Sequence, residues 1–428
     1  MRRYILFSVA LLFVLASLLE FGSVAQGSPQ YTTIYSFTGK NGDAAEPSGP
    51  VLLDSEGAIY GTSTAGGGGP YQNQGTVFKF TPPPGSGGAW TESILHDFTG
   101  GADGDAADTG VLFGPGGVLY GTTAGGGASP YGGSFGTVFE LTPPSGGGWT
   151  HTVLYSFQGG TTGSYPGALV LAPNGALYGA AYEGGPRRSA GCPGVGCGLI
   201  FELTEQAGTW HEMVLHSFAY ANGDNPNTPL VLGSDGTLYG TTAIGGPTGG
   251  GVVFALKPSG STWTYTILHT FAGGGGNDGD EPSYGLVSGP NGVLYGVTYI
   301  GGPGSCNAGQ GCGTVFEMSP ASGGGWTEKV LYSFAGGNDG SEPVSLILGD
   351  DGNLYGTTFF GGSSNCYEGC GTVFELSPDA GGGWTETVLY RWTASSRGSA
   401  VAFRNGVLYG TVFVFGASNL GSVFTLVP

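Results

Sequence analysis

Carboxylates are the residues of this sequence best suited to chemistry, because they recur in short clusters between glycines and prolines. Two clusters, Asp103-x-Asp105-x-x-Asp108 and Asp278-x-Asp280-Glu281, place several oxygen ligands within a few residues. Hard cations such as Ca²⁺ bind carboxylate and carbonyl oxygens, so both clusters are candidate calcium sites, although neither has the complete EF-hand pattern. The alternative is a set of solvated turns.

The same acids would also serve as hydrogen-bond acceptors for a bound ligand, on which nearby aromatic rings would stack. The candidate ligand-binding residues are Asp43, Glu46, Asp103, Asp105, Asp108, Asp278, Asp280, Glu281, Asp339, Glu342, Tyr71, Tyr131, Tyr299 and Phe360. All of them are expected in loops.

Six cysteines form three sequence-local pairs, Cys192/Cys197, Cys306/Cys312 and Cys366/Cys370. In every pair the second cysteine immediately precedes a glycine that begins a recurrent Gly-x-Val/Ile-Phe run. This shared register predicts three disulfides that pin their loops in an oxidising compartment. Zinc ligation is the alternative, but no pair has two-residue spacing and no histidine lies nearby.

Nucleophilic catalysis has little support. Three histidines, His96, His216 and His269, occupy a position that is tyrosine in other copies of the repeat described below, which indicates a packing role. His151 and His211 are expected to be solvent-exposed. A Gly-x-Ser-x-Gly match at residues 132–136 lacks the strand-turn-helix context of a hydrolase nucleophile. No catalytic residue is therefore predicted.

The elements that position these residues belong to a sevenfold repeat. A Gly-x-Leu/Ile-Tyr-Gly motif recurs with a mean period of about 58 residues, near that of four-stranded propeller blades. Its tyrosines are Tyr60, Tyr120, Tyr178, Tyr239, Tyr295, Tyr355 and Tyr409. Each is followed by the phenylalanine of Gly-x-Val/Ile-Phe, at Phe78, Phe139, Phe201, Phe254, Phe316, Phe374 and Phe424.

Four runs per repeat read as strands, because they are short, rich in Val, Ile, Tyr, Phe and Thr, and bounded by turn residues. In chain order they are strand A (short and apolar), B (Tyr-Gly), C (Val-Phe) and D (Trp to Phe). Four strands cannot bury both faces alone, so we predict an all-β, seven-bladed β-propeller. The run from Tyr31 to Phe37 matches strand D and would complete the last blade. An open solenoid, the alternative, would leave two free sheet edges.

Propeller geometry places the D-to-A and B-to-C connections on one face, which we call the loop face. The acids above belong to the D-to-A connections, and the aromatics, with Tyr182 and Tyr367, to the B-to-C connections. Loops on a rigid scaffold commonly carry recognition, so the loop face is the candidate binding face.

The first 25 residues have the pattern of a secretory signal peptide. Arg2 and Arg3 precede an uncharged 16-residue run, and Ser23-Val24-Ala25 offers a cleavage site. An uncleaved anchor is the alternative, but the run is shorter than the roughly 20 residues a membrane span needs. We expect a secreted or periplasmic single domain over residues 26–428.

Several stretches, among them residues 354–358, 371–376 and 330–334, resemble the repeat of the GloVer tandem-repeat family. The resemblance covers nearly the whole chain after the signal peptide. It implies a bacterial, extracytoplasmic protein of propeller-like build, with variable membrane or cell-wall anchors among its members. It implies no particular chemistry.

The amino-acid composition limits the kinds of partner that we expect. Acids outnumber bases 30 to 11, and the net charge of −19 argues against nucleic acid and anionic lipid. We expect a monomer without a membrane anchor in the mature chain, without a cofactor other than calcium, that binds carbohydrate or a protein partner. The alternative is a carbohydrate-active lyase or hydrolase with paired carboxylates at the mouth of the central channel.

Overall fold

The structure, a computed structural model, describes residues 28–68, 73–85, 87–129, 132–185, 191–192, 194–226, 228–366, 369–393, 398–414 and 419–428. The predicted signal peptide, Tyr71, Tyr131 and Tyr367 lie outside these ranges. No helix in the described part of the chain is long and apolar enough to cross a membrane.

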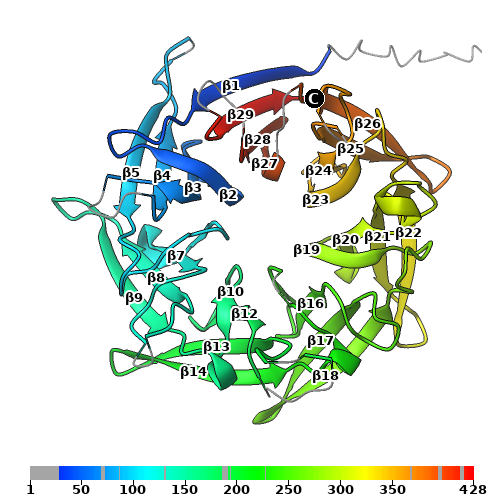
Figure 1. Cartoon of the computed structure of the whole chain (residues 1–428), viewed down its shortest axis with the longest axis horizontal. Coiled ribbons are helices and arrows are strands. Elements are labelled where there is room, and N and C mark those ends of the chain that lie inside the picture. Colours follow the sequence, from blue (N-terminus) through cyan, green and yellow to red (C-terminus); the bar gives the residue numbers. More distant parts are fainter. Residues whose placement is uncertain are drawn as a thin grey trace, which may run out of the picture.

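Seven antiparallel sheets stand in a ring around a central axis, which confirms the predicted seven-bladed propeller (Figure 1). Blade 1 contains β2 (Ala44–Leu53), β3 (Ile59–Gly66), β4 (Thr76–Thr81) and β5 (Thr91–Asp97). Blade 2 contains β6 (Val111–Phe113), β7 (Leu119–Thr123), β8 (Thr137–Thr142) and β9 (Thr150–Ser156). Blade 3 contains β10 (Ser164–Pro166), β11 (Val170–Leu171), β12 (Leu177–Glu183), β13 (Leu199–Gln206) and β14 (Thr209–Ser217). Its inner strand is split, because β10 and β11 both pair with β12.

The other four blades continue the pattern. Blade 4 contains β15 (Val231–Leu232), β16 (Leu238–Thr242), β17 (Val252–Ser259) and β18 (Thr262–Thr270). Blade 5 contains β19 (Asp280–Ser288), β20 (Leu294–Ile300), β21 (Thr314–Pro320) and β22 (Trp326–Ser333). Blade 6 contains β23 (Ser341–Leu348), β24 (Leu354–Phe360), β25 (Thr372–Pro378) and β26 (Trp384–Arg391). Blade 7 contains β27 (Gly398–Arg404), β28 (Val407–Val412), β29 (Ser422–Val427) and β1 (Gln30–Ser36). Short 3₁₀ turns are η1 (Pro115–Gly117), η2 (Gly160–Thr162), η3 (Tyr220–Asn222), η4 (Pro290–Gly292) and η5 (Asn307–Gly309).

The two repeat motifs recur together because one accommodates the other. In blade 3, Gly179 of the Tyr-Gly motif pairs directly with Phe201 of the Val-Phe motif. A Cβ atom added to Gly179 would lie 2.4 Å from Cζ of the Phe201 ring, and the corresponding distance is at most 2.7 Å in the other six blades. Only glycine leaves room for the fully buried ring.

The first strand closes the ring. β1 pairs antiparallel with β29, so blade 7 takes its outer strand from the N-terminal end of the described chain, as predicted (Figure 1). Tyr31 of β1 stacks on Tyr390 of blade 6 with ring centroids 3.9 Å apart. The fully buried Trp392 donates from Nε1 to the Tyr31 hydroxyl at 3.4 Å. Closure therefore joins three segments that are distant in sequence.

Neighbouring blades are also joined near the axis by one repeated backbone hydrogen bond. Six residues with φ between 53° and 60°, here called the rim positions, lie at or near the start of an inner strand: Glu46, Ala106, Tyr165, Asn225, Glu281 and Glu342. Each donates its N–H to a B-to-C carbonyl of the preceding blade, at 2.7–3.2 Å. These acceptors belong to Leu420, Gln74, Phe135, Cys197, Gly250 and Cys312. The D-to-A and B-to-C connections therefore share one face, as predicted.

Outer strands of neighbouring blades meet through side-chain pairs at fixed registers, here called the outer seams. His96 stacks on His151 of the next blade at 4.0 Å, and His216 stacks on Tyr265 at 4.1 Å. The packing role predicted for His96 and His216 is thus correct. The prediction of an exposed His151 is wrong, because its ring is half-buried against His96, whereas His211 is exposed.

Candidate functional site

Several predicted ligand-binding acids instead close the turns between blades. Asp43 accepts hydrogen bonds from the Thr38 N–H (2.6 Å) and hydroxyl. Asp103 accepts the corresponding pair from Thr99. A carboxylate that caps a turn in this way has few lone pairs left for a ligand.

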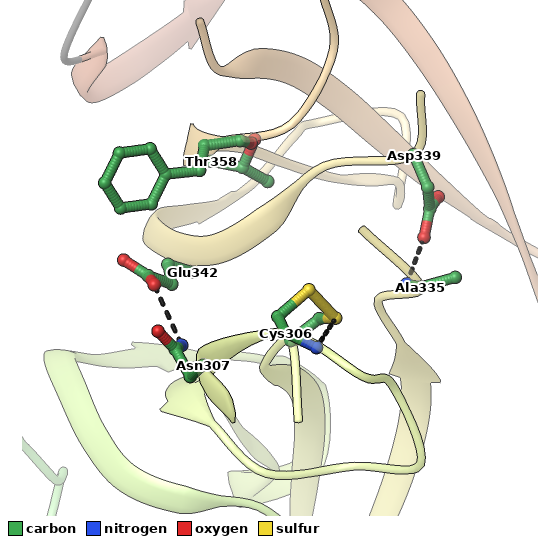
Figure 2. The surroundings of a disulfide bond; sticks show 8 residues. Cys306, Asn307, Ala335, Asp339, Glu342 and Thr358 are labelled. Atoms are coloured by element: carbon green, nitrogen blue, oxygen red, sulfur yellow. Dashed lines mark hydrogen bonds between the residues drawn. A yellow bond between two sulfur atoms is a disulfide. The ribbon is translucent and has the colours of Figure 1, made fainter. Parts of the chain in front are cut away.

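Two further acids repeat this arrangement. Asp339 accepts the Ala335 N–H at 2.6 Å, as Figure 2 shows, and the Tyr332 hydroxyl at 2.7 Å. Asp278 lies 3.2 Å from Nε2 of His269. These contacts link the turns to the outer seams, away from the axis.

Other predicted loop residues belong to strands, which corrects their assignment. Glu46 lies in β2, Asp280 and Glu281 lie in β19, and Glu342 lies in β23. Likewise Tyr299 and Phe360 lie at the ends of β20 and β24. The inner strands continue pairing beyond their apolar cores, for example between Ser341 and Phe360. Asp105 lies in a connection, as predicted, and forms an isolated bridge with Gly125.

Glu342 forms a tightly held corner between blades 5 and 6. Its side chain is only 4% exposed, and its Oε1 accepts a 2.8 Å hydrogen bond from Asn307 Nδ2 (Figure 2). Its N–H donates to the Cys312 carbonyl at 2.8 Å. Burial and the charges of Asp280 and Glu342 raise the pKa of Glu281. Burial and Glu342 also raise the pKa of Tyr299.

All three predicted disulfides form, between Cys192 and Cys197, Cys306 and Cys312, and Cys366 and Cys370. The second cysteine of the first two supplies a carbonyl that accepts from a rim position of the next blade. These two disulfides therefore hold the loops whose carbonyl groups accept the hydrogen bonds of Asn225 and Glu342.

The predicted calcium residues do not converge. Among the described residues, Cys192, Cys197 and Asp224 are the one group of three potential ligands with donor atoms within 4.8 Å of one another. Both cysteines are oxidised in a disulfide and provide no thiolate. Calcium binding at Asp103, Asp105, Asp108, Asp278, Asp280 and Glu281 stays a prediction.

A cavity of about 340 Å³ opens between blades 2 and 3 at the loop face. Its lining residues are Asp108, Thr109, Ala124, Tyr165, Pro166, Gly167, Tyr182 and Glu183. Asp108 has a buried Oδ1 without a hydrogen-bond partner among the described residues, and burial raises its pKa to about 6. The Tyr165 side chain is 46% exposed.

Of this lining, the sequence singled out only Asp108 as a site residue and Tyr182 as a loop aromatic. Tyr165 and Glu183 were missed. A signal was present, since Tyr165 precedes a proline at the position where three other blades have Glu46, Glu281 and Glu342.

A second cavity, of about 360 Å³, lies at the seam of blades 7 and 1 near the A-to-B turns. Arg404 lines it but donates to the backbone carbonyls of Asp54 and Ser55. Its cation therefore serves to join the blades.

Fold, disulfides and repeat geometry together define a disulfide-pinned β-propeller. The chain belongs to the Gloeobacter/Verrucomicrobia repeat family, whose model matches residues 21–192, 134–324 and 189–424. This membership confirms the resemblance seen in the sequence. Together with the disulfides, it indicates an extracellular location.

None of the curated proteins matches the sequence. Among solved structures, a catalytically inactive virginiamycin B lyase of Staphylococcus aureus, crystallised with quinupristin, is similar with a TM-score of 0.54 and 13% identity, over 94% of this chain and all of that one. A puromycin hydrolase mutant is similar with a TM-score of 0.51 and 12% identity, over 86% of this chain and 50% of that one. At such identities the likeness concerns the fold alone.

Proposed function

We propose that the protein is a secreted or periplasmic binding module that recognises its ligand on the loop face without chemical turnover. The rim positions carry this proposal. Their backbone conformation and their hydrogen bond to the preceding blade are the same in six blades, whereas their side chains are three glutamates, a tyrosine, an asparagine and an alanine. A constant scaffold with variable side chains is typical of recognition surfaces.

The chemistry of this face favours a neutral or cationic ligand. Among the described residues, neither the rim positions nor the lining of the cavity between blades 2 and 3 includes a lysine or arginine. Carboxylates accept hydrogen bonds from hydroxyl or ammonium groups, and Tyr165 offers a half-exposed ring. A polysaccharide fits these groups best, and a protein partner would need a basic or hydroxyl-rich loop.

Secretion is the second part of the proposal. Disulfides in three B-to-C loops suit an oxidising compartment, and the predicted cleavage after Ala25 would deliver the chain there. N-terminal sequencing of the exported protein tests this directly. A first residue at Gln26 is expected, and a retained Met1 would contradict it.

One observation favours the alternative of a carbohydrate-active enzyme. Asp108, whose pKa burial raises to about 6, shares its cavity with the carboxyl group of Glu183. Two carboxyl groups at one site, one of them with a raised pKa, are the usual arrangement in glycoside cleavage.

A glycan array combined with a reducing-sugar release assay separates the two functions. We expect the chain from residue 26 onward to retain a glycan and to release no reducing ends from it. Release that disappears in Asp108→Asn would replace the binding function with the enzymatic one. Failure to retain any glycan would contradict recognition of polysaccharide.

A further inference from the structure

We propose that the cavity between blades 2 and 3 binds one neutral sugar ring, with Tyr165 as the stacking platform and Asp108 as a hydrogen-bond acceptor. This inference rests on the proposed binding function and assigns its site and ligand class. No other rim position among the described residues combines an exposed aromatic ring with a lined cavity.

The size of the cavity limits the ligand. Its volume of about 340 Å³ lies at the lower end of the ~300–1,000 Å³ usual for small-molecule sites. It therefore fits a single ring, whereas further units of a chain would extend over the loop face.

Its floor is rigid because both blades contribute to it through hydrogen bonds. Thr122 of blade 2 contacts the Thr109 hydroxyl at 2.6 Å and lies 3.3 and 3.2 Å from the carbonyl oxygens of Pro166 and Gly167 in blade 3. The Gly167 N–H donates to the Ala180 carbonyl at 2.8 Å. A site held in this way loses little entropy when a ligand binds.

Its polar groups match hydroxyl donors. Asp108 lines the cavity, and its buried Oδ1 has no hydrogen-bond partner among the described residues, so we assign its carboxyl group as an acceptor for a ligand hydroxyl. Glu183 already accepts the Ser164 hydroxyl at 3.2 Å through Oε2, which leaves Oε1 as a second acceptor.

Its aromatic group matches the C–H face of a sugar. Tyr165 has φ of +54°, an unusual conformation for tyrosine, and donates its N–H to Phe135 of blade 2 at 3.1 Å. That hydrogen bond fixes the backbone, and Tyr165 as a whole is 46% exposed beside the cavity. Two carboxyl groups, with no cationic side chain among the described residues of the lining, disfavour an anionic ligand.

The test uses saturation-transfer NMR with the chain from residue 26 onward and three kinds of probe: neutral methyl hexosides, methyl glucuronide as the anion, and glucosamine as the cation. A neutral hexoside is expected to bind, and Tyr165→Ala is expected to weaken it at least tenfold. Alanine is tolerated in this backbone conformation, because Ala106 adopts it in blade 2 with φ of 53°.

Tyr284→Ala is the matched control. Tyr284 is also exposed, at 53%, and also has positive φ, 63°, but it belongs to blade 5 and does not line the cavity. Its substitution is expected to leave hexoside affinity unchanged within twofold. Ala124→Phe is a second variant that should abolish binding by filling the cavity, since blade 6 has Phe359 at the same register.

Three results would overturn the inference: hexoside affinity unaffected by both Tyr165→Ala and Ala124→Phe, tighter binding of glucuronide than of the hexosides, or binding of glucosamine alone. Hexoside binding that is lost in Tyr284→Ala but not in Tyr165→Ala would retain the proposed function and reject this cavity. Absence of both hexoside binding and retention on the glycan array would reject both.

Discussion

The phenolic hydroxyl of Tyr155 in β9 donates a 2.8 Å hydrogen bond to Oε2 of Glu212 in β14, across the outer seam between blades 2 and 3. In the equivalent pair between blades 7 and 1, the hydroxyl of Tyr35 in β1 lies 3.1 Å from Oε2 of Glu92 in β5. Both pairs join the outer strand of one blade to that of the next. In these two seams a glutamate occupies a partly buried position. Other seams have an aromatic ring at the same register, such as His151 or Tyr265.

Four glutamates occupy this register, and each has one oxygen atom that lacks a partner. Oε1 is buried without a hydrogen-bond partner among the described residues in Glu92, Glu212, Glu328 and Glu386. A bare oxygen of this kind is costly when the carboxyl group is charged and much less so when it is protonated. Burial raises the pKa to about 8 in Glu92 and to about 7 in the other three.

Stability is accordingly expected to fall as the solution becomes alkaline. An acid whose pKa is higher in the folded chain stabilises the fold while it is protonated. That contribution is complete below the ordinary glutamate pKa of 4.5 and is lost as the pH rises through about 7 to 8. His151 and His216, whose pKa burial lowers to about 4, act in the opposite direction below pH 6.5. Calorimetry should show a lower Tm at pH 9 than at pH 6.5.

The variant Glu212→Gln distinguishes two causes of this pH dependence: ionisation of the seam carboxyl groups, and general charge repulsion in a chain with net charge −19. The amide cannot ionise, so the variant should lose less Tm than the wild type between pH 6.5 and 9. Glu56→Gln changes an exposed glutamate and serves as the control, with the wild-type dependence expected. Equal pH dependence in all three proteins would show that the seam carboxyl groups remain ionised.

The glycine of the Tyr-Gly motif is expected to be as important as the aromatic ring it accommodates. Gly179→Ala should destabilise the fold by about 1–3 kcal/mol, as overpacking usually does, because its Cβ would lie 2.4 Å from the Phe201 ring. Urea unfolding measures the loss. Gly147→Ala, with no atom within 4 Å of the added Cβ, should be neutral.

A smaller side chain at position 201 provides the complementary test. In a chain that already carries Phe201→Leu, the further change Gly179→Ala should cost less than it does alone, because the space of the ring is vacated. If the losses of free energy of unfolding from the two substitutions simply add, the cost of Gly179→Ala does not come from a clash with the Phe201 ring.

These relationships explain why the fold was predictable and much of the site was not. Blade number and strand order follow from motifs such as Tyr178-Gly179 and Phe201, which repeat because every blade solves the same packing problem. Closure followed from the match of the Tyr31–Phe37 run to the outer strands. Both are properties of the repeat itself.

Site residues depend on how one blade meets the next, which a single repeat does not encode. Asp103 was predicted to bind a ligand, but the N–H and hydroxyl of Thr99 occupy its carboxylate. Tyr165 was missed because its exposure depends on the hydrogen bond from its N–H to Phe135 in another blade. The variation at the rim positions becomes visible in the sequence only when the repeats are aligned on the proline that follows Tyr165 and its counterparts Glu46, Glu281 and Glu342.

The disulfide between Cys306 and Cys312 is expected to stabilise the joint of blades 5 and 6 as well as its own loop. Changing both cysteines to serine should cost about 2 kcal/mol, the loop-closure value for so short a loop. A further loss is expected from Asn307 and the Cys312 carbonyl, which both hydrogen-bond to Glu342. Urea unfolding of the double serine variant and of Asn307→Ala separates the two contributions. An unchanged free energy of unfolding in the serine variant would show that neighbouring contacts suffice to hold the joint.

Ring closure by β1 is expected to be essential for cooperative unfolding. A chain that begins at Gly39 lacks β1, so β29 becomes a free edge, Tyr390 loses its stacking partner and Trp392 loses the Tyr31 hydroxyl. Free edges promote association between chains. The truncated protein should therefore sediment as a concentration-dependent oligomer and unfold over a broader urea range, whereas a chain that begins at Ser28 should behave as a monomer.

A synthetic peptide of residues 28–38 should restore the sharp transition by binding along β29. A truncated chain that stays monomeric and unfolds with an unchanged midpoint would mean that blade 7 is stable with three strands. The hydrogen bonds of the rim positions and the remaining outer seams would then suffice to hold the ring.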